Sequence, residues 1–480
     1  METKHFFKIF VSLIWIAALS SCKKGSNVTP VLAVSSSTVS FAAAGGSQDI
    51  SVTSNADWNV SNPIVSWLQL STTSGNSGST VIHLTTLSQN ATGAIRSGVL
   101  AVNSSNGESR KVTVSQATTT YPSYNITPKA PDSTGMSSTA VQLAAKIQLG
   151  WNLGNTMEAS GGETGWGNPV TTESYIKFVK QSGFNAIRIP CAWDWHVDNK
   201  ATAHIDPNWL NRVKEVVGYC VNNNMYVLLN IHWDGGWLDQ NCTLAKKDSV
   251  SAKVKAFWEQ IATAMRDFDE HLMFASCNEP VTNNAEEMNV LLSYHQTFIN
   301  AVRSTGGKNA NRCLVLQGTS DLITANAFPT DPVPNKLMYE EHNYTPFQFT
   351  ALDGDASWGK MFYYWGAGHH STIEPDRNPN WGEESEQIKW LDKMKSMFID
   401  KNIPVLMGEY GAYRRGGSNH IPKDLATHND AVDYWITYLT KQALARGIKP
   451  FWWDTGGIIN RSNNAVIDQR SLDAIIAGTK

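Results

Sequence analysis

The 480-residue sequence has little charge, and neither sign dominates. Charged residues make up 17% of the chain, and 39 Lys and Arg against 42 Asp and Glu leave a formal charge of −3. A chain without a positive excess has no composition that would attract a polyanion, so we expect no nucleic-acid partner. Hydrophobic residues at 41% indicate folded globular domains rather than a disordered chain.

Cysteine is scarce, and none of the six residues has the Cys-x-x-Cys spacing of a zinc or redox site. Beyond Cys22, the five that remain are an odd number and are interpreted as buried thiols, with one bridged pair as the alternative. His369-His370 has no carboxylate or Cys at ligand spacing. We therefore expect no metal and no cofactor.

Long apolar runs are missing except near the start of the chain. Lys4 and Lys8 precede an apolar stretch at 9–19, which is too short to span a bilayer but suits a secretory signal. Leu19-Ser20-Ser21-Cys22 resembles a bacterial lipobox, in which the Cys is acylated. We expect a lipoprotein signal at 1–21 and a tether at 22–30, with membrane contact by the lipid anchor only. The alternative is an ordinary signal peptide with a chance Cys.

The segment 31–118 is rich in Ser, Thr and Val and poor in charge. Its apolar residues alternate with polar ones, as in short β-strands, at 49–53, 80–84 and 112–114. Asn106-Gly107 is typical of a tight hairpin. This pattern predicts a small all-β, immunoglobulin-like sandwich, with Trp58 and Trp67 in its core.

The motifs of this segment, Ala56-Asp57-Trp58-Asn59-Val60 and Val112-Thr113-Val114-Ser115-Gln116-Ala117, resemble the BACON domain of Bacteroidota surface proteins. The resemblance leaves a glycan-binding role and a spacer role open, and we favour the spacer. With the lipobox, it implies an exported lipoprotein on the outer membrane, or cell surface, of a Gram-negative, Bacteroidota-like bacterium. Residues 119–136 carry three prolines among Ser and Thr and are predicted to be a linker.

The segment 137–480 alternates short apolar runs with longer stretches of helical period. The eight runs are Ile147 to Asn155, Ala186 to Trp193, Met225 to Asp234, Leu272 to Glu279, Cys313 to Thr319, Leu337 to Tyr344, Ile403 to Tyr410 and Lys449 to Asp454. Asp206-Pro207 is typical of a helix start. Eight such repeats predict an α/β fold, a (β/α)8 TIM barrel. A doubly wound open sheet is the alternative, but no glycine-rich phosphate turn supports it.

Most of these runs are apolar at the start and polar at the end. The polar endings are Arg188, His232, Asn278-Glu279, His342 with Tyr344, Glu409, and Trp452-Trp453-Asp454. Parallel barrel strands bring all these ends to one rim, where barrel enzymes hold their active sites. Two glutamates on one rim can cleave a glycosidic bond, one as proton donor and the other as an ionised nucleophile or base.

The ordered motif set from about residue 137 to the C-terminus resembles glycoside hydrolase family 5, above all its subfamily 4 of endoglucanases, xyloglucanases and lichenases. The motifs are Gly150-Trp151-Asn152-Leu153-Gly154-Asn155-Thr156, Ile187-Arg188-Ile189-Pro190, Ile231-His232-Trp233-Asp234, Asn278-Glu279-Pro280, His342-Asn343-Tyr344, Gly408-Glu409-Tyr410-Gly411 and Phe451-Trp452-Trp453-Asp454. The resemblance implies a retaining mechanism with Glu279 as acid/base and Glu409 as nucleophile.

The same resemblance implies supporting roles for other rim residues. Asn278 would bond the 2-hydroxyl of the cleaved sugar, and Arg188 and Tyr344 would hold Glu409 ionised. His232 and His342 would frame that sugar, with His342 also near the acid/base. Glu340 and Glu341 adjoin the rim but match no family carboxylate.

Several aromatic and polar residues are candidates for binding substrate. Trp452 would form the floor under the cleaved sugar, whereas alternation along the strand predicts that Trp453 points away from the rim. Asn155, Trp233, Trp237, Trp358 and Asp454 complete the predicted substrate-binding set, with capping of the strand as the alternative role for Asp454. The loop residues Trp166, Trp365 and Trp381 are further candidate platforms for glycan.

The sequence therefore predicts a retaining endo-β-1,4-glucanase that acts as a monomer on plant β-glucan, whether cellulose-type, mixed-linkage glucan or xyloglucan. A xyloglucan-specific endoglucanase is the alternative within this class. A surface glycan-binding protein without activity, and a transglycosylase using the same two glutamates, are the alternatives outside it.

Overall fold

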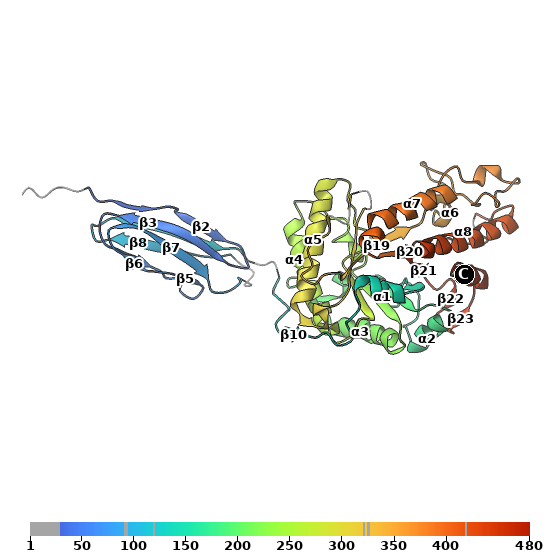
Figure 1. The fold of residues 1–480 in the computed structure, drawn as a ribbon, viewed down its shortest axis with the longest axis horizontal. Helices are drawn as coiled ribbons and strands as arrows, with labels where there is room; N and C mark the ends of the chain where they lie inside the picture. Colours follow the sequence, from blue (N-terminus) through green and yellow to red (C-terminus); the bar gives the residue numbers. More distant parts are fainter. Residues whose placement is uncertain (1–28, 91–94, 119–120, 320–321, 324–326, 418–419) are drawn as a thin grey trace, which may run out of the picture. The chain divides into compact units, whose positions relative to one another are not determined.

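The computed structural model describes residues 29–90, 95–118, 121–319, 322–323, 327–417 and 420–480 (Figure 1). The predicted signal segment and Cys22 lie outside these ranges. The chain divides into two compact units, one ending at Thr118 and the other beginning at Thr119. Within the described ranges, no helix combines the length and the apolar character needed to cross a lipid bilayer.

The first unit is a sandwich of two β-sheets. One sheet has the order β1-β3-β7-β5 and the other the order β2-β9-β8-β4-β6. The strands are β1 (Leu32–Val34), β2 (Thr38–Phe41), β3 (Ser47–Ser54), β4 (Trp58–Ser61), β5 (Leu68–Leu70), β6 (Ser74–Gly75), β7 (Gly78–Thr86), β8 (Arg96–Ser104) and β9 (Ser109–Gln116). Trp58 and Trp67 are buried among its Val, Leu and Ile side chains. The predicted all-β sandwich and its core are confirmed.

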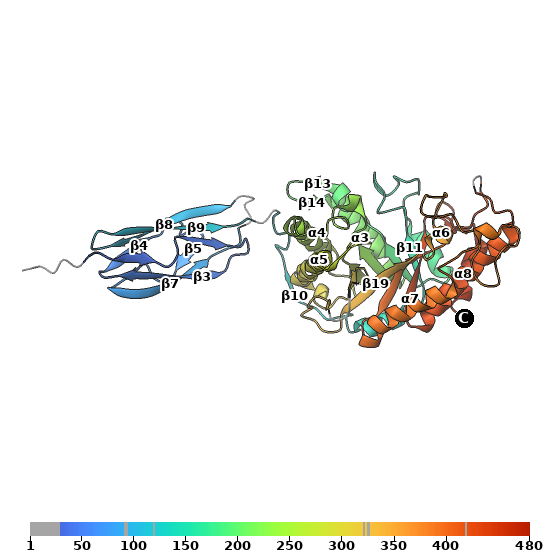
Figure 2. The ribbon, with the colours of Figure 1, turned by 90° about the horizontal axis from the view of Figure 1, so that it is seen from above.

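The second unit is built on a closed barrel of eight parallel strands (Figure 2). The strands are β11 (Gly150–Leu153), β12 (Ala186–Ile189), β15 (Tyr226–Asn230), β16 (Leu272–Ala275), β18 (Leu314–Gln317), β19 (Leu337–Asn343), β20 (Val405–Tyr410) and β21 (Lys449–Asp454). Each lies within one of the eight apolar runs of the sequence. The predicted (β/α)8 barrel is confirmed, and the open sheet is wrong because β21 pairs with β11 and closes the ring.

Helices surround this barrel. They are α1 (Ala140–Lys146), α2 (Glu173–Gln181), α3 (Pro207–Asn222), α4 (Lys247–Met265), α5 (Ala285–Ser304), α6 (Phe347–Thr350), α7 (Glu384–Met397), α8 (Leu425–Ala445) and α9 (Gln469–Ala477). The helix α3 begins as the sequence predicts, because the Asp206 side chain accepts a hydrogen bond from the Asn208 N–H and Pro207 occupies the first turn.

Short strand pairs complete the unit. They are β10 (Lys129–Pro131) with β17 (Gly306–Gly307), β13 (Val197–Asn199) with β14 (His204–Ile205), and β22 (Ile459–Asn460) with β23 (Ala465–Val466).

Successive side chains of the barrel strands face the helices and the barrel axis in turn. The axial set, which includes Leu228, Met273 and Phe451, packs with Leu143 of α1. Because α1 covers the end of the barrel where the strands begin, the opposite end is the one left for polar groups.

Residues 121–136, which belong to the predicted linker at 119–136, pack against the barrel unit. The Tyr124 N–H donates to Glu259, the Asn125 side chain donates to the Ser304 carbonyl, and β10 pairs with β17. Proline and Ser-Thr composition describes backbone stiffness but not what a stiff segment packs against, so this packing was not visible in the sequence.

The five cysteines of the described residues, Cys191, Cys220, Cys242, Cys277 and Cys313, are buried and free, as predicted.

Candidate active site

The polar strand ends gather around one hollow of about 570 Å³ at the end of the barrel where the strands finish. The wall contains a residue from, or just after, five of the eight barrel strands. The predicted residues that line it are His232, Asn278, Glu279, Tyr344, Glu409, Trp452 and Asp454. Chain segments that are far apart in sequence, from His232 to Ser471, therefore share one cleft, as the barrel geometry requires.

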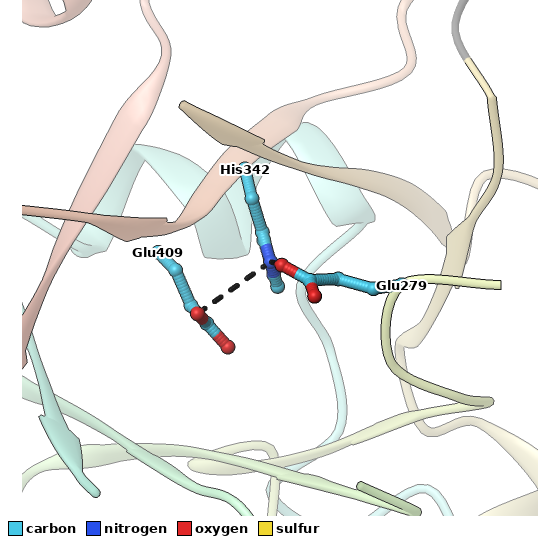
Figure 3. Close-up of side chains that lie close together, drawn as sticks. All are labelled: Glu279, His342 and Glu409. Atoms are coloured by element: carbon cyan, nitrogen blue, oxygen red, sulfur yellow. Dashed lines mark hydrogen bonds and ion pairs between the residues drawn. The ribbon is translucent and has the colours of Figure 1, made fainter. Parts of the chain in front are cut away.

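Glu279 and Glu409 face each other across the imidazole of His342 (Figure 3). The His342 Nδ1 lies 2.8 Å from Glu279 Oε1 and 3.7 Å from Glu409 Oε2. One oxygen of each carboxylate and one nitrogen of His342 all lie within 4.8 Å of one another. An inverting glycosidase needs a gap of about 6.5–9.5 Å for water, so this shorter separation favours direct attack by a carboxylate and retention.

Arg188 holds the side of the cleft that carries Glu409. Its side chain is fully buried on β12, and its guanidinium donates to Glu409 Oε1 at 2.7 Å and to Asn278 Oδ1 at 2.6 Å. The Tyr344 hydroxyl donates to the other oxygen of Glu409 at 3.0 Å. Both Glu409 oxygens therefore accept hydrogen bonds from neighbouring side chains, which fixes the orientation of this carboxylate.

The backbone at Glu279 is unusual. Its φ is +46°, in the left-handed region that side-chain-bearing residues seldom adopt. The Glu279 N–H donates at 3.0 Å to Gln317 Oε1, at the end of β18. Gln317 is a functional candidate that our sequence analysis missed, although its place as the last residue of a barrel strand was a signal.

Glu340 is a second residue that the sequence analysis passed over. It is fully buried on β19, and its Oε1 lies 2.8 Å from Arg188 Nε and 3.1 Å from His342 Nε2. It occupies the space over Gly408, where a Cβ would lie only 2.1 Å from the same oxygen. Glu340 thus joins Arg188, which contacts Glu409, to His342, which contacts Glu279.

The pKa values of the two histidines of the site are shifted in opposite directions. Burial lowers the pKa of His342, but the Glu409 charge and its carboxylate hydrogen bonds outweigh burial and raise the pKa to about 10. Burial, with the positive charges of Arg188 and His342, holds the pKa of His232 well below its usual value. At neutral pH His342 is therefore a cation and His232 is a neutral ring.

The acid/base carboxyl is coupled to His342. Burial raises the pKa of Glu279, but the hydrogen bond and charge of His342 outweigh burial and leave the pKa below its ordinary value. The proton that these two groups share therefore lies on His342 Nδ1, hydrogen-bonded to Glu279. Burial also raises the pKa of Glu340, and the charges of Arg188 and His342 reverse this and lower it.

The aromatic floor differs from the expectation for β21. Trp453 lines the cleft and its ring stacks with His232, with ring centroids 5.9 Å apart and planes 9° apart. Trp452 also borders the cleft, but it is 4% exposed and packs edge-on against Tyr410. The prediction that Trp453 points away from the rim is wrong, because Phe451 and Trp453 are the residues on the axial side of this strand. The role of Trp452 as the floor remains a prediction.

Other predicted binding residues lie around the cleft with different contacts. Asp454 is buried and accepts the Gly456 and Ile458 N–H groups, which fits the capping role, and burial raises its pKa. The Asn155 N–H bonds Glu158. Among the described residues around the cleft, neither Asn155 nor the two tryptophans after β15 is part of its wall.

The tryptophans of the loops fall into two groups. Trp233 is 46% exposed, whereas Trp237 is half-buried against Phe257 with its Nε1 donating to Asp234. Trp365 is fully buried and donates to the Gly382 carbonyl, so its prediction as a glycan platform is wrong. Exposed platforms remain at Trp166, Trp358 and Trp381.

Glu279, His342 and Glu409 are also the described side chains close enough together to offer three ligand atoms to a metal ion. His342 already carries a proton between two carboxylates, and the Arg188 guanidinium contacts Glu409. A cation entering here would compete with two resident positive charges. The donor set fits proton transfer better than metal binding.

Comparison with known proteins agrees with this geometry. The family model described as cellulase, glycosyl hydrolase family 5, matches residues 152–457. The chain belongs to glycoside hydrolase family 5. A second model, BACON, described as a putative N-terminal binding domain, matches residues 56–117.

Relatives of this family 5 enzyme include the xyloglucan-specific endo-β-1,4-glucanase BoGH5A of Bacteroides ovatus, 31% identical over 98% of this chain and 96% of that protein. Endoglucanase B of Clostridium cellulovorans is 31% identical over 71% of this chain and 76% of its own.

Solved structures resemble the enzyme as well. The Bacteroides ovatus family 5 xyloglucanase in complex with a XXXG heptasaccharide aligns with a TM-score of 0.68 at 29% identity, covering 94% of this chain and all of the other. XEG5B, a xyloglucan-specific β-1,4-glucanase from a ruminal metagenomic library in complex with XXLG, gives 0.65 at 36% identity, covering 71% of this chain and 96% of its own.

Proposed function

We propose that this family 5 enzyme is a retaining endo-β-1,4-glucanase of plant β-glucans, with xyloglucan as its main substrate. The observation that carries the proposal is the Glu279–His342–Glu409 group at the end of the barrel, with carboxylate oxygens within 4.8 Å. Its relative across nearly the whole chain is named for xyloglucan specificity, which favours the branched glucan.

In the first step Glu409 attacks the anomeric carbon and forms a glycosyl ester, while the glycosidic oxygen leaves with a proton from Glu279. Glu279 obtains that proton from His342 Nδ1, along the hydrogen bond of 2.8 Å. The Glu409 charge is what most strongly raises the pKa of His342. As the ester forms and this charge disappears, His342 holds its proton less tightly, so attack and proton delivery support each other.

In the second step Glu279, now ionised, takes a proton from water, and the hydroxyl attacks the anomeric carbon from the face that the leaving group has vacated. The bond between this carbon and Glu409 breaks and frees the Glu409 carboxylate, and the proton on Glu279 returns to His342 Nδ1 along their hydrogen bond. Asn278, whose Oδ1 accepts a hydrogen bond from Arg188, is the residue that we assign to the 2-hydroxyl of the sugar, through a contact that strengthens at the transition state. Neutral His232 stacks with Trp453 and supports its ring as a wall for the sugar.

Activity is tested by the reducing ends released from xyloglucan, mixed-linkage glucan, carboxymethyl-cellulose, mannan and xylan, with EDTA present. We expect release from the first three, fastest from xyloglucan. Glu279→Gln should lower kcat by about 10²- to 10⁴-fold, and Glu409→Gln should abolish turnover. No release from any glucan would refute the proposal, and lengthened products without net hydrolysis would indicate a transglycosylase.

We further propose that the chain is an exported lipoprotein anchored at the cell surface through Cys22, with the BACON-like unit as a spacer. The lipobox-like Leu19-Ser20-Ser21-Cys22 supports this proposal. Acyl chains bound to Cys22 would anchor the protein stably, since each buried methylene contributes about 0.8 kcal/mol. Cys22→Ser should move the enzyme from the membrane to the soluble fraction of cells, and an unchanged membrane fraction would refute the lipid anchor.

A further inference from the structure

A second hollow, of about 500 Å³, lies in the segment that follows β19. Its wall includes Gln348, Trp358, Lys360, Asp376, Asn380 and Trp381. Trp358 and Trp381 are two of the tryptophans that the sequence predicts to contact glycan, and this hollow is the concave site that both of them border.

The short helix α6 contributes side chains to the walls of both hollows. Phe347 and Thr350 of this helix line the catalytic cleft, whereas Gln348 lines the second hollow. The Phe347 and Trp358 rings lie 6.3 Å apart between their centroids. A polymer leaving the cleft past Phe347 would therefore meet an aromatic surface that continues into the second hollow.

Two tryptophan side chains at the second hollow are exposed to solvent. Trp358 is 62% exposed and Trp381 is 44% exposed, and both border the second hollow. Flat exposed aromatic faces are matched by the apolar faces of pyranose rings, and their exposure without a ligand is unfavourable. Their position in a concave site, rather than singly on the surface, points to a bound ring.

Gln348 supplies an independent sign of a missing ligand. Its side chain is 7% exposed, and its Oε1 has no hydrogen-bond partner among the described residues. A buried amide oxygen without a donor is costly. Gln348 also lines the hollow, so a rotation of its side chain amide would bring this oxygen to a sugar hydroxyl there, which could donate to it as an apolar ligand could not.

The walls of the hollow are fixed by a scaffold of ion pairs. Arg377 binds both oxygens of Asp355 at 2.6 and 3.0 Å and lies over the Tyr363 ring. At the rim, Lys360 lies 3.7 Å from Asp376, and both remain exposed to offer a donor and an acceptor to hydroxyl groups. A preformed site of this kind binds without ordering a loop first.

We propose that this second hollow is a distal subsite that binds one pyranose unit of the polysaccharide whose backbone occupies the catalytic cleft. The unit stacks on Trp358 or Trp381 and donates a hydroxyl hydrogen bond to Gln348. The proposal rests on the proposed function, because the ligand is part of the same glucan. In this proposal α6 lies between the catalytic cleft, where the bond is cleaved, and a distal subsite that only binds the polysaccharide.

The test compares kcat/KM on polymers with kcat/KM on a short aryl β-cellobioside, for Trp358→Ala, Trp381→Ala and Gln348→Met. We expect the ratio of polymer to short substrate to fall roughly 2- to 10-fold in each variant, through a higher KM on the polymer. Ile373→Ala is the matched control, since Ile373 is an apolar residue of the same segment and is 62% exposed. Its ratio should equal that of the wild type.

Two polymers identify the sugar that is bound. A fall on xyloglucan alone would assign the subsite to a branch sugar, and a fall on mixed-linkage glucan as well would assign it to the backbone; both support the subsite. An unchanged ratio on both polymers in all three variants would overturn it. Gln348→Met removes no aromatic side chain. If a Trp variant has a low melting temperature, the kcat/KM ratio of Gln348→Met therefore decides whether the subsite exists. Wild-type protein inactive on every polymer would refute the proposed function instead.

Discussion

At the scale of single residues, the site contains a third carboxylate, Glu340, which is fully buried behind the two glutamates of the proposed mechanism. Glu340 contacts both Arg188 and His342, and so couples the groups that hold the nucleophile to those that hold the acid/base. Removing the charge of Glu340 would leave the buried cations Arg188 and His342 without one of their carboxylate partners. The loss of one partner from a buried ion pair is strongly destabilising to the folded protein.

We therefore expect Glu340→Gln to cost about 3 kcal/mol of unfolding free energy. It should also move the alkaline limb of the kcat/KM profile to lower pH, because Glu340 helps to raise the pKa of His342. The control is Glu341→Gln, whose carboxylate accepts a hydrogen bond from the Tyr339 hydroxyl instead. Thermal unfolding and pH–rate profiles provide the measurements. A Glu340→Gln profile that overlays the wild type would contradict the assigned role.

The pKa of His342 gives a second prediction. Its pKa in the folded protein is about 10, against 6.5 for an ordinary His. A raised pKa means that the folded state holds the proton more tightly. The stability from this proton is thus complete below about pH 6.5 and is lost as pH rises through about 10. The gap in unfolding free energy between wild type and His342→Gln should be constant at low pH and narrow toward pH 10. A gap unchanged up to pH 10 would rule this out.

At the scale of elements, the sequence predicted all eight barrel strands because a strand buried on both faces reads as a continuous apolar run. It also predicted the rim, since parallel strands bring their polar ends together. It did not predict which side of a strand faces the axis. The Trp453 error arose there, since alternation defines two sides of β21 without saying which one is inside.

Contacts across the barrel were also beyond sequence reasoning. Gln317 meets the Glu279 N–H because β16 and β18 are neighbours, and Glu340 meets Arg188 from across the barrel. Register between β19 and β20 shifts by an irregularity next to His342, which no local pattern encodes. Family resemblance could name the two glutamates, whereas the residues that hold them follow only from the pairing of distant strands.

At the scale of the whole molecule, the two units have separate hydrophobic cores. The segment from Tyr121 to Met136 packs on the barrel, so the second unit begins well before the first barrel strand.

A chain that starts at Tyr121 should keep kcat/KM on soluble glucan within about 2-fold of the full chain, since domains with their own cores fold alone. A chain that starts at Met136 should be less stable, because it lacks the contacts of Tyr124 and Asn125 with the barrel. Thermal melting and soluble-glucan assays compare the two. Equal melting temperatures would show that the packed segment contributes nothing, and loss of activity in both would show that the barrel needs the first unit.

The five ionisable groups at the mouth of the barrel do not cancel. Glu279, Glu340 and Glu409 surround Arg188 and His342, which leaves one acidic group in excess beside the carbon under attack. That imbalance suits the positive oxocarbenium character of the transition state. The excess negative charge also predicts which inhibitors bind best. A ring amine shaped like glucose, which carries a positive charge where glucose is neutral, should inhibit the enzyme at a lower concentration than glucose does.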